Sequence, residues 1–209
     1  DLKFTLFTIS GGIYIKGKFS GSPKLNVFII SLGTILASWM GTTGAAILLI
    51  RPLLRANKWR KYSVHTVIFF IFLVANIGGA LTPLGDPPLF LGFLQGVTFF
   101  WTMKHLFFPM VFISFFLLVI YYFIDSYYYR REDINGVQYI EEEVFSIQGK
   151  INIILILCVI SSVLMSGIWK PNDDIYIYGI HLELQNIVRD CILLILAWIS
   201  WKSTHLDIR

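Results

Sequence analysis

The chain has 209 residues, of which 56% are hydrophobic and only 14% are charged, and its mean hydropathy is +0.70. Soluble domains carry roughly 25% charged residues, so this composition excludes an ordinary soluble domain. Several apolar runs reach the ~20 residues that a membrane-spanning helix needs. The sequence therefore predicts an all-α, polytopic membrane protein.

The net charge of +4 does not indicate nucleic-acid binding, because the basic residues lie beside apolar segments and act as topology signals. Cys158 and Cys191 lie inside apolar segments, without the spacing of a disulfide framework or a metal site. No Ser/His/Asp pattern, Cys/His pattern or phosphate loop is present, so we expect no enzyme. The expected partners are the lipid bilayer and small ions, and no cofactor is expected beyond Na⁺ and H⁺ as transported or coupling ions.

Residues 1–24 predict the end of a truncated transmembrane helix followed by a basic loop. The apolar run at residues 4–15 is too short to span a bilayer, and no initiator Met precedes it. We therefore expect a piece of a longer protein, cut inside a helix, whose missing remainder is a further partner. A signal peptide is the alternative, but Lys3 is the only positive side chain before the run and no small-residue cleavage site follows it.

Residues 25–54 are mostly apolar, with Gly41, Thr42, Thr43 and Gly44 at their middle. Basic residues flank the segment on both sides, in residues 1–24 and in the loop at residues 55–62, so both flanks are expected on the cytoplasmic side. Two full crossings need ~40 residues, more than the segment has. The segment predicts a re-entrant hairpin with residues 41–44 at its tip. One long helix with a Gly/Thr kink is the alternative.

Residues 63–100 predict a broken transmembrane helix. Between residues 76 and 88 stand three glycines, three prolines and Asp86. An interior Gly weakens a helix by ~1 kcal/mol and a Pro by ~3 kcal/mol, and a charge at the bilayer centre costs roughly 3 kcal/mol or more. Irregular backbone at that depth occurs where protein buries it or where it lines a wet cavity, as in transporter binding sites. A surface turn between two short membrane helices is the alternative.

The rest of the chain continues the alternation of spans and loops. We expect an external loop at residues 101–105, and each cytoplasmic loop carries an excess of Lys or Arg. The segments expected further along are a transmembrane helix at 106–124, a cytoplasmic loop at 125–150, and transmembrane helices at 151–169 and 187–201.

Four side chains outside residues 76–88 bear on this topology. His65 and His105 are expected at the membrane interface. Arg189 is expected to extend its charge to the interface. Its neighbour Asp190 is not expected to pair with it, because adjacent helical residues point about 100° apart.

Side by side, the hairpin tip and the break offer oxygen ligands to a cation. The Thr42 and Asp86 side chains, with Asn76 and Thr82, form a candidate Na⁺ site, and Thr43 adds a hydroxyl. Half-helix carbonyl ends favour cations and amino ends favour anions, so the architecture suits either. Asp86 could bind Na⁺ and H⁺ competitively, which is the minimum chemistry of antiport.

The pattern Asn76-x-Gly78-Gly79-x-x-Thr82-Pro83-x-Gly85-Asp86 resembles the broken-helix motif of the ion transporter superfamily, most closely its NhaD-type sodium/proton antiporters. Thr42-Thr43-Gly44-Ala45 resembles the preceding hairpin tip. The resemblance implies inverted repeats, a site between them at mid-membrane, and one domain that moves against a scaffold. This chain would hold the first repeat core and the start of the second. The implied site residues are Thr42, Thr43, Gly44, Asn76, Gly78, Gly79, Thr82, Gly85 and Asp86.

The function expected from the sequence is sodium/proton antiport in the inner (plasma) membrane of a bacterium. A citrate, dicarboxylate or arsenite carrier of the same superfamily is the first alternative, disfavoured because the break has no Arg for a carboxylate. The second alternative is an inert membrane fragment of a decayed gene. Assembly into homodimers is left open.

Overall fold

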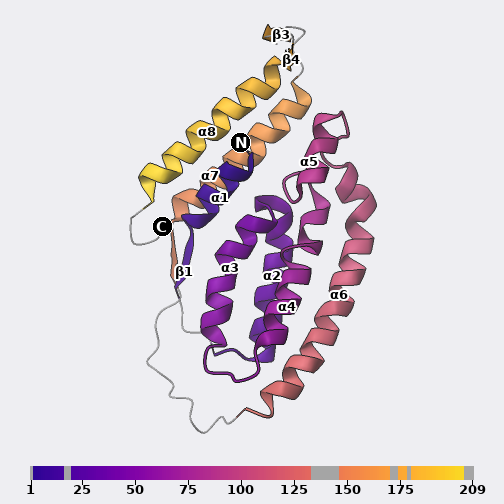
Figure 1. Cartoon of the computed structure of the whole chain (residues 1–209), viewed down its shortest axis with the longest axis vertical. Coiled ribbons are helices and arrows are strands. Elements are labelled where there is room, and N and C mark those ends of the chain that lie inside the picture. Colours follow the sequence, from indigo (N-terminus) through magenta and orange to yellow (C-terminus); the bar gives the residue numbers. More distant parts are fainter. Residues whose placement is uncertain (1, 17–19, 133–145, 170–173, 178–179, 205–209) are drawn as a thin grey trace.

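The computed structural model describes residues 2–16, 20–132, 146–169, 174–177 and 180–204. These residues form eight α-helices, one short 3₁₀-helix and two small antiparallel strand pairs. The helices lie in two groups that are offset along the long axis of the molecule (Figure 1). The architecture confirms the prediction of an all-helical chain.

The first group contains α1 (Leu2–Gly11), α7 (Lys150–Ile168) and α8 (Leu184–Ser203), which pack against one another. Asn152 joins all three helices, because its amide donates to the Gly12 carbonyl at 2.8 Å and accepts from the Ser200 hydroxyl at 2.6 Å. The buried amide thus fixes the end of α1 against the start of α7 and the end of α8.

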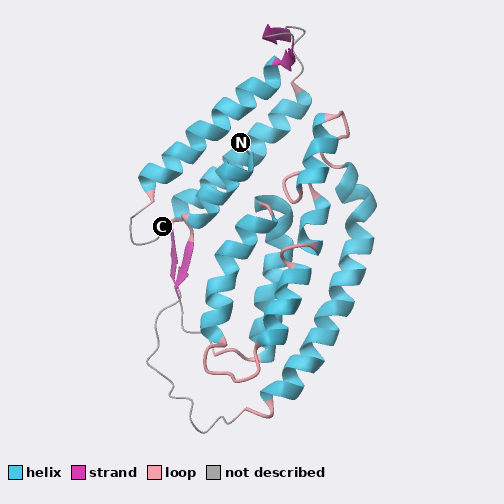
Figure 2. Ribbon diagram, in the orientation of Figure 1, coloured by secondary structure: helices cyan, strands magenta, loops and turns pink. Residues whose placement is uncertain are grey.

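Two strand pairs flank this group (Figure 2). β1 (Tyr14–Lys16) follows α1 and pairs antiparallel with β2 (Ser146–Gln148), which precedes α7. β3 (Asp174–Ile177) pairs with β4 (Ile180–Glu183) in the connection between α7 and α8. Both pairs lie at helix ends, outside the helical core.

The second group contains the chain between residues 23 and 129. Its helices pack around α2, and α6 covers the outer side of α2 and α4. In chain order they are α2 (Pro23–Met40), α3 (Thr42–Ala56), α4 (Val64–Leu73), η1 (Ile77–Leu81), α5 (Pro87–Leu94) and α6 (Trp101–Tyr129).

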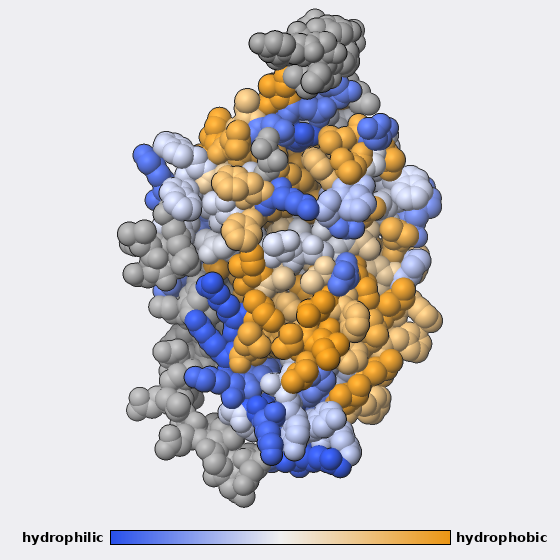
Figure 3. All heavy atoms as spheres, in the orientation of Figure 1, coloured by the Kyte–Doolittle hydropathy of each residue, from blue (hydrophilic) through white to orange (hydrophobic). Residues whose placement is uncertain are grey.

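Five described helical stretches are long and apolar enough to cross a membrane, and they include α2, α6, α7, α8 and the stretch Val64–Leu81. Much of the surface viewed in Figure 3 is apolar, with hydrophilic side chains toward both ends and a smaller number near the middle. On α6 alone, Phe108 is 79% exposed and Phe112 is 64% exposed. A protein with such a surface needs lipid around it, so the chain is a multi-pass membrane protein.

Several boundaries differ from those expected. A single residue, Gly41, separates α2 from α3, and residues 42–44 form the first turn of α3 instead of an irregular tip. The helix α6 begins at Trp101, so residues 101–105 are helical and the loop lies at residues 95–100. The reason is Gly96, whose φ of +97° favours glycine and turns the chain there, whereas no Gly or Pro interrupts residues 101–108.

Candidate pocket between the two helix groups

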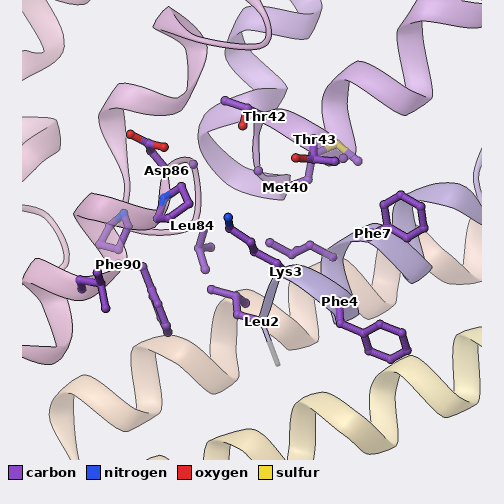
Figure 4. Close-up of a pocket in the computed structure, with 17 residues that line it drawn as sticks. Leu2, Lys3, Phe4, Phe7, Met40, Thr42, Thr43, Leu84, Asp86 and Phe90 are labelled. Carbon is purple, nitrogen blue, oxygen red and sulfur yellow. The ribbon is translucent and has the colours of Figure 1, made fainter.

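A pocket of about 590 Å³ lies where the two helix groups meet. Three segments form its wall: α1, the turn between α2 and α3, and the connection that leads into α5 (Figure 4). The lining includes an amine, a carboxylate and two hydroxyls, from Lys3, Asp86, Thr42 and Thr43. The rest of the wall is mostly apolar, so these groups set its chemistry.

The turn at Gly41 brings the start of α3 to this pocket. Gly41 has φ +80° and ψ +149°, a conformation that is essentially restricted to glycine. A Cβ at this position would also lie 3.2 Å from the Leu84 carbonyl oxygen. Directly beyond the turn, the Thr42 N–H donates to the Gly85 carbonyl at 3.3 Å. The α2–α3 turn and the connection before α5 therefore form one unit.

The connection between α4 and α5 is held by side chains that replace helical hydrogen bonds. Asn76 donates its amide to the Ile71 carbonyl at 3.0 Å, which satisfies an acceptor at the end of α4. Ser38 of α2 donates to the Gly78 carbonyl at 2.5 Å. The Thr82 hydroxyl donates to the Ser38 carbonyl and accepts from the Leu84 N–H. These bonds fix the irregular backbone against α2.

The glycines of this connection allow close backbone contacts. A Cβ on Gly78 would lie 2.7 Å from the Thr34 carbonyl oxygen, so η1 can approach α2 this closely only with glycine there. A Cβ on Gly79 would lie 2.9 Å from the Gly85 carbonyl oxygen. The chain therefore folds back on itself between Gly79 and Gly85, which directs residue 86 to the pocket.

Of the site residues expected from the sequence, the structure brings five to the pocket wall: Thr42, Thr43, Gly44, Gly85 and Asp86. Asn76, Gly78, Gly79 and Thr82 lie outside the wall. The expected sodium ligands are therefore divided, because the Asn76 amide and the Thr82 hydroxyl bond to backbone atoms. A ligand role for any of these residues stays a prediction.

Asp86 immediately precedes α5, where a carboxylate commonly caps the helix. Its side chain makes no such capping bond and remains exposed at the pocket. Pro87 and Pro88 follow it and have no N–H to donate. The Asp86 carboxylate is therefore available to a cation or a proton from the pocket.

Lys3 was not identified from the sequence as a site residue. Its side chain extends from α1 into the pocket, opposite the wall that carries Asp86 (Figure 4). In the sequence it reads as a single charge before a short apolar run. One signal could have identified it. An isolated Lys beside an apolar segment that is too short to span a bilayer is a candidate residue for the lining of a polar cavity.

A second polar cluster, buried in the α2–α6 group, was also missed. The side chains of Arg60 and Asp125 are both 0% exposed, and the Arg60 guanidinium lies 2.6 Å from Asp125 Oδ1. His65 Nε2 lies 2.7 Å from the same oxygen, and Asn26 donates to Oδ2 at 3.1 Å. The expectation that His65 lies at the interface missed this pairing. Asp125 was expected to begin a loop, whereas it lies within α6.

The expectation for Arg189 and Asp190 is corrected as well. Arg189 Nε donates to Asp190 Oδ1 at 2.9 Å, and Nη2 lies 2.8 Å from the same oxygen. The long guanidinium side chain bends back far enough to overcome the 100° separation. The Arg189 side chain is only 5% exposed, so it is buried among the helices.

These observations define a multi-pass helical membrane protein with a mostly apolar pocket between two helix groups, into which a few polar side chains extend. A family model described as "Putative citrate transport" matches residues 2–209, and the chain belongs to this family, within the ion transporter superfamily. It is a family of transporters and not of enzymes, as the sequence predicted. No curated protein and no solved structure matches the chain.

Proposed function

We propose that the chain forms the substrate pocket of a secondary carrier for a small organic carboxylate such as citrate, coupled to a cation at Asp86. The observation that carries this proposal is the placement of Lys3 and Asp86 on facing walls of one pocket, in a chain of the citrate transport family. A carboxylate substrate needs a cationic partner. The sequence offered no such residue in the break, and Lys3 supplies one from α1.

The start of α3 adds to this anion site. Residues 42–44 form the first turn of a 15-residue helix, whose N-terminal N–H groups carry partial positive charge toward the pocket. The Thr42 and Thr43 hydroxyls lie in the same wall. An uncompensated Asp86 carboxylate would repel an anionic substrate. Binding of Na⁺ or H⁺ at Asp86 would remove that repulsion, which provides a physical basis for coupling.

We further infer that α2 and α3 form a re-entrant hairpin and that α4, η1 and α5 form a broken transmembrane helix. At ~1.5 Å per residue, the 18 residues of α2 reach ~27 Å, close to the ~30 Å apolar core of a bilayer, whereas the 15 of α3 reach only ~22 Å and the 8 of α5 only ~12 Å. The basic stretch around Arg51, Arg55 and Lys58 would then be cytoplasmic. The plasma membrane remains the expected location.

The test is uptake of labelled citrate into proteoliposomes that contain the purified protein, with an imposed Na⁺ or pH gradient. Lys3→Gln is expected to raise the KM for citrate about tenfold, because it removes the charge that faces the substrate. Asp86→Asn is expected to abolish the dependence of uptake on the cation gradient. Lys104→Gln, an exposed position on α6 outside the pocket, serves as the matched control and should leave uptake unchanged.

Sodium/proton antiport of the NhaD type is the second candidate, favoured by the exposed Asp86 carboxylate beside the Thr42 and Thr43 hydroxyls. Its signature is a Na⁺-driven proton flux in liposomes that contain no organic anion. That flux without citrate uptake would contradict the carboxylate proposal. Uptake of arsenite instead of citrate would point to the arsenite branch, and the absence of all three activities would support an inert fragment.

A further inference from the structure

A second cavity, of about 570 Å³, lies at the end of the molecule that carries the connections α5–α6 and α7–α8. This is the end opposite the basic connection between α3 and α4 (Figure 1). Residues 93–100, the end of α7 and the start of α8 line it, and Gln185 and Asn186 contribute polar groups. Glu183 also lines it, and its carboxylate accepts from Gln185 at 2.8 Å and from Asn186 at 2.9 Å.

Two phenylalanines of α5 line this cavity and the pocket between the two helix groups, which we call the central pocket. Phe90 lines the central pocket and Phe93 lines the second cavity, and their ring centroids are 6.3 Å apart. Phe93 packs against α7 at Gly167, where a Cβ would lie 2.7 Å from the ring. The two neighbouring rings therefore belong to the walls of both cavities, and Phe93 fills the contact between α5 and α7 at Gly167.

Arg189 of α8 contacts a residue of each cavity. Its Nη1 donates to the Asn186 amide oxygen at 2.8 Å, and its guanidinium carbon lies 5.3 Å from the centroid of the Phe90 ring. Within the described part of the chain, the other bonds of its side chain go to Asp190, whose side chain is 37% exposed. A guanidinium has five N–H groups, so these bonds leave two of them for another acceptor.

We propose that Arg189 favours anionic solutes over cationic ones as they pass between the second cavity and the central pocket. Phe90 and Phe93 would form the barrier on this route. The proposal rests on the function proposed above, a carboxylate carried through the central pocket. A buried guanidinium is costly in a membrane protein and is commonly functional. The planar donors of the Arg189 guanidinium suit a carboxylate. Asp190 pairs with this guanidinium while no substrate carboxylate is present.

The test measures access to the central pocket and does not require transport. In a Cys158→Ala/Cys191→Ala background, Thr43→Cys provides one thiol in the pocket. Its rate of modification is measured with an anionic and a cationic methanethiosulfonate reagent of similar size, added from the side of the second cavity. Arg189→Gln is expected to lower the anion-to-cation rate ratio about fivefold, because one charge close to the passage is removed. Arg189→Lys should retain most of the ratio.

Two further variants separate the charge effect from a loss of structure. Asp190→Asn should raise the anion-to-cation ratio, because it removes the carboxylate that competes for Arg189. Phe90→Ala should raise both rates together, because it opens the barrier without changing charge. Lys202→Gln, on the same helix near Trp198, is the matched control and should change neither.

An unchanged rate ratio in both Arg189→Gln and Asp190→Asn would overturn the proposal. A thiol at position 43 that stays unreactive even with Phe90→Ala would equally contradict the passage. Citrate uptake by the unmodified protein tests the proposed function separately. The charge selectivity of the passage can therefore hold or fail independently of whether citrate is the solute.

Discussion

Asp125 binds side chains from three other parts of the chain: Asn26 of α2, Arg60 of the connection after α3, and His65 of α4. Asn57 strengthens this cluster by donating to Asn26 at 2.8 Å and accepting from Arg60 at 3.1 Å. Burial of two charges is costly, and their attraction offsets the cost when most of the remaining polar atoms are also bonded, as they are here except at Arg60 Nε, which has no partner among the described residues. The cluster therefore fixes the end of α6 to the base of α2 and α4.

Asp125→Asn is expected to destabilise the folded protein by about 3–5 kcal/mol, because it leaves the Arg60 guanidinium buried without its counter-charge. The measurement is the thermal unfolding midpoint of the purified protein in detergent. Glu132→Gln is the matched control at the same end of α6, since Glu132 is half-buried and accepts from two backbone N–H groups without a buried counter-charge. Its effect should be smaller, about 1 kcal/mol, because the variant loses an ordinary hydrogen bond. Equal losses in the two variants would contradict a special role for Asp125.

The sequence offered no route to this cluster. Asp125 ends an apolar run and is followed by polar residues, which is the ordinary pattern of a loop boundary. Only the packing of α6 against α2 and α4 shows that the helix continues through it. Lys3 was missed for a similar reason, because a pocket between two helix groups depends on tertiary contacts that local patterns do not encode.

At the scale of elements, the irregular connection between α4 and α5 depends on close contact with α2. Gly78 lies against Thr34 and Ala37, where no side chain fits. Ser38 and Thr82 then exchange hydrogen bonds with the backbone of the opposite segment. The connection is therefore a rigid element that α2 supports along its length.

Gly78→Ala is expected to destabilise the protein by about 1–3 kcal/mol, because the added methyl group must displace the backbone of α2. Gly92→Ala is the matched control on α5, where the nearest atom would be 3.8 Å away. That change should be neutral or stabilising by up to about 1 kcal/mol, since alanine favours a helix. Thermal unfolding in detergent measures both. An unchanged midpoint for Gly78→Ala would show that η1 does not need this contact.

Residues 76–88 were predictable as an interruption, because prolines and glycines disfavour a helix wherever they stand. The roles of the individual side chains were not. Asn76 and Thr82 are good cation ligands by chemistry, yet their polar atoms bond to backbone carbonyls in the last turns of α4 and α2. Polar side chains near an irregular backbone often bond to its unpaired groups. A sequence pattern cannot distinguish such a structural hydrogen bond from a ligand-binding role.

At the scale of the whole molecule, the two helix groups meet along α1 and α3. A Cβ on Gly44 of α3 would lie 3.2 Å from the Ser10 Cβ of α1. This contact lies beside the central pocket, where Gly44 is part of the wall. Hydropathy alone predicted most of the spans, but it gave no indication of which helices share a group, because each group contains both strongly and weakly apolar spans.

A disulfide between Ser10→Cys and Gly44→Cys is expected to stop citrate uptake, because it prevents movement of one group against the other. The distance is close to the 3.5–4.5 Å that disulfide Cβ atoms need. Uptake is measured before and after oxidation in the Cys158→Ala/Cys191→Ala background, and a reductant should restore it. Each single cysteine variant is the control. Full uptake by the oxidised protein would show that transport needs no relative movement here.

The buried cluster at Asp125 also constrains how the protein is made. Asp125 lies 99 residues after Asn26, 65 after Arg60 and 60 after His65. During synthesis these three side chains leave the ribosome long before their shared acceptor does. In a nascent chain that stops before the end of α6, the Arg60 guanidinium therefore lies at the bilayer without its partner, the Asp125 carboxylate. We expect such arrested intermediates to be the ones that quality-control proteases remove, and release of α6 from the translocon to complete the first stable unit.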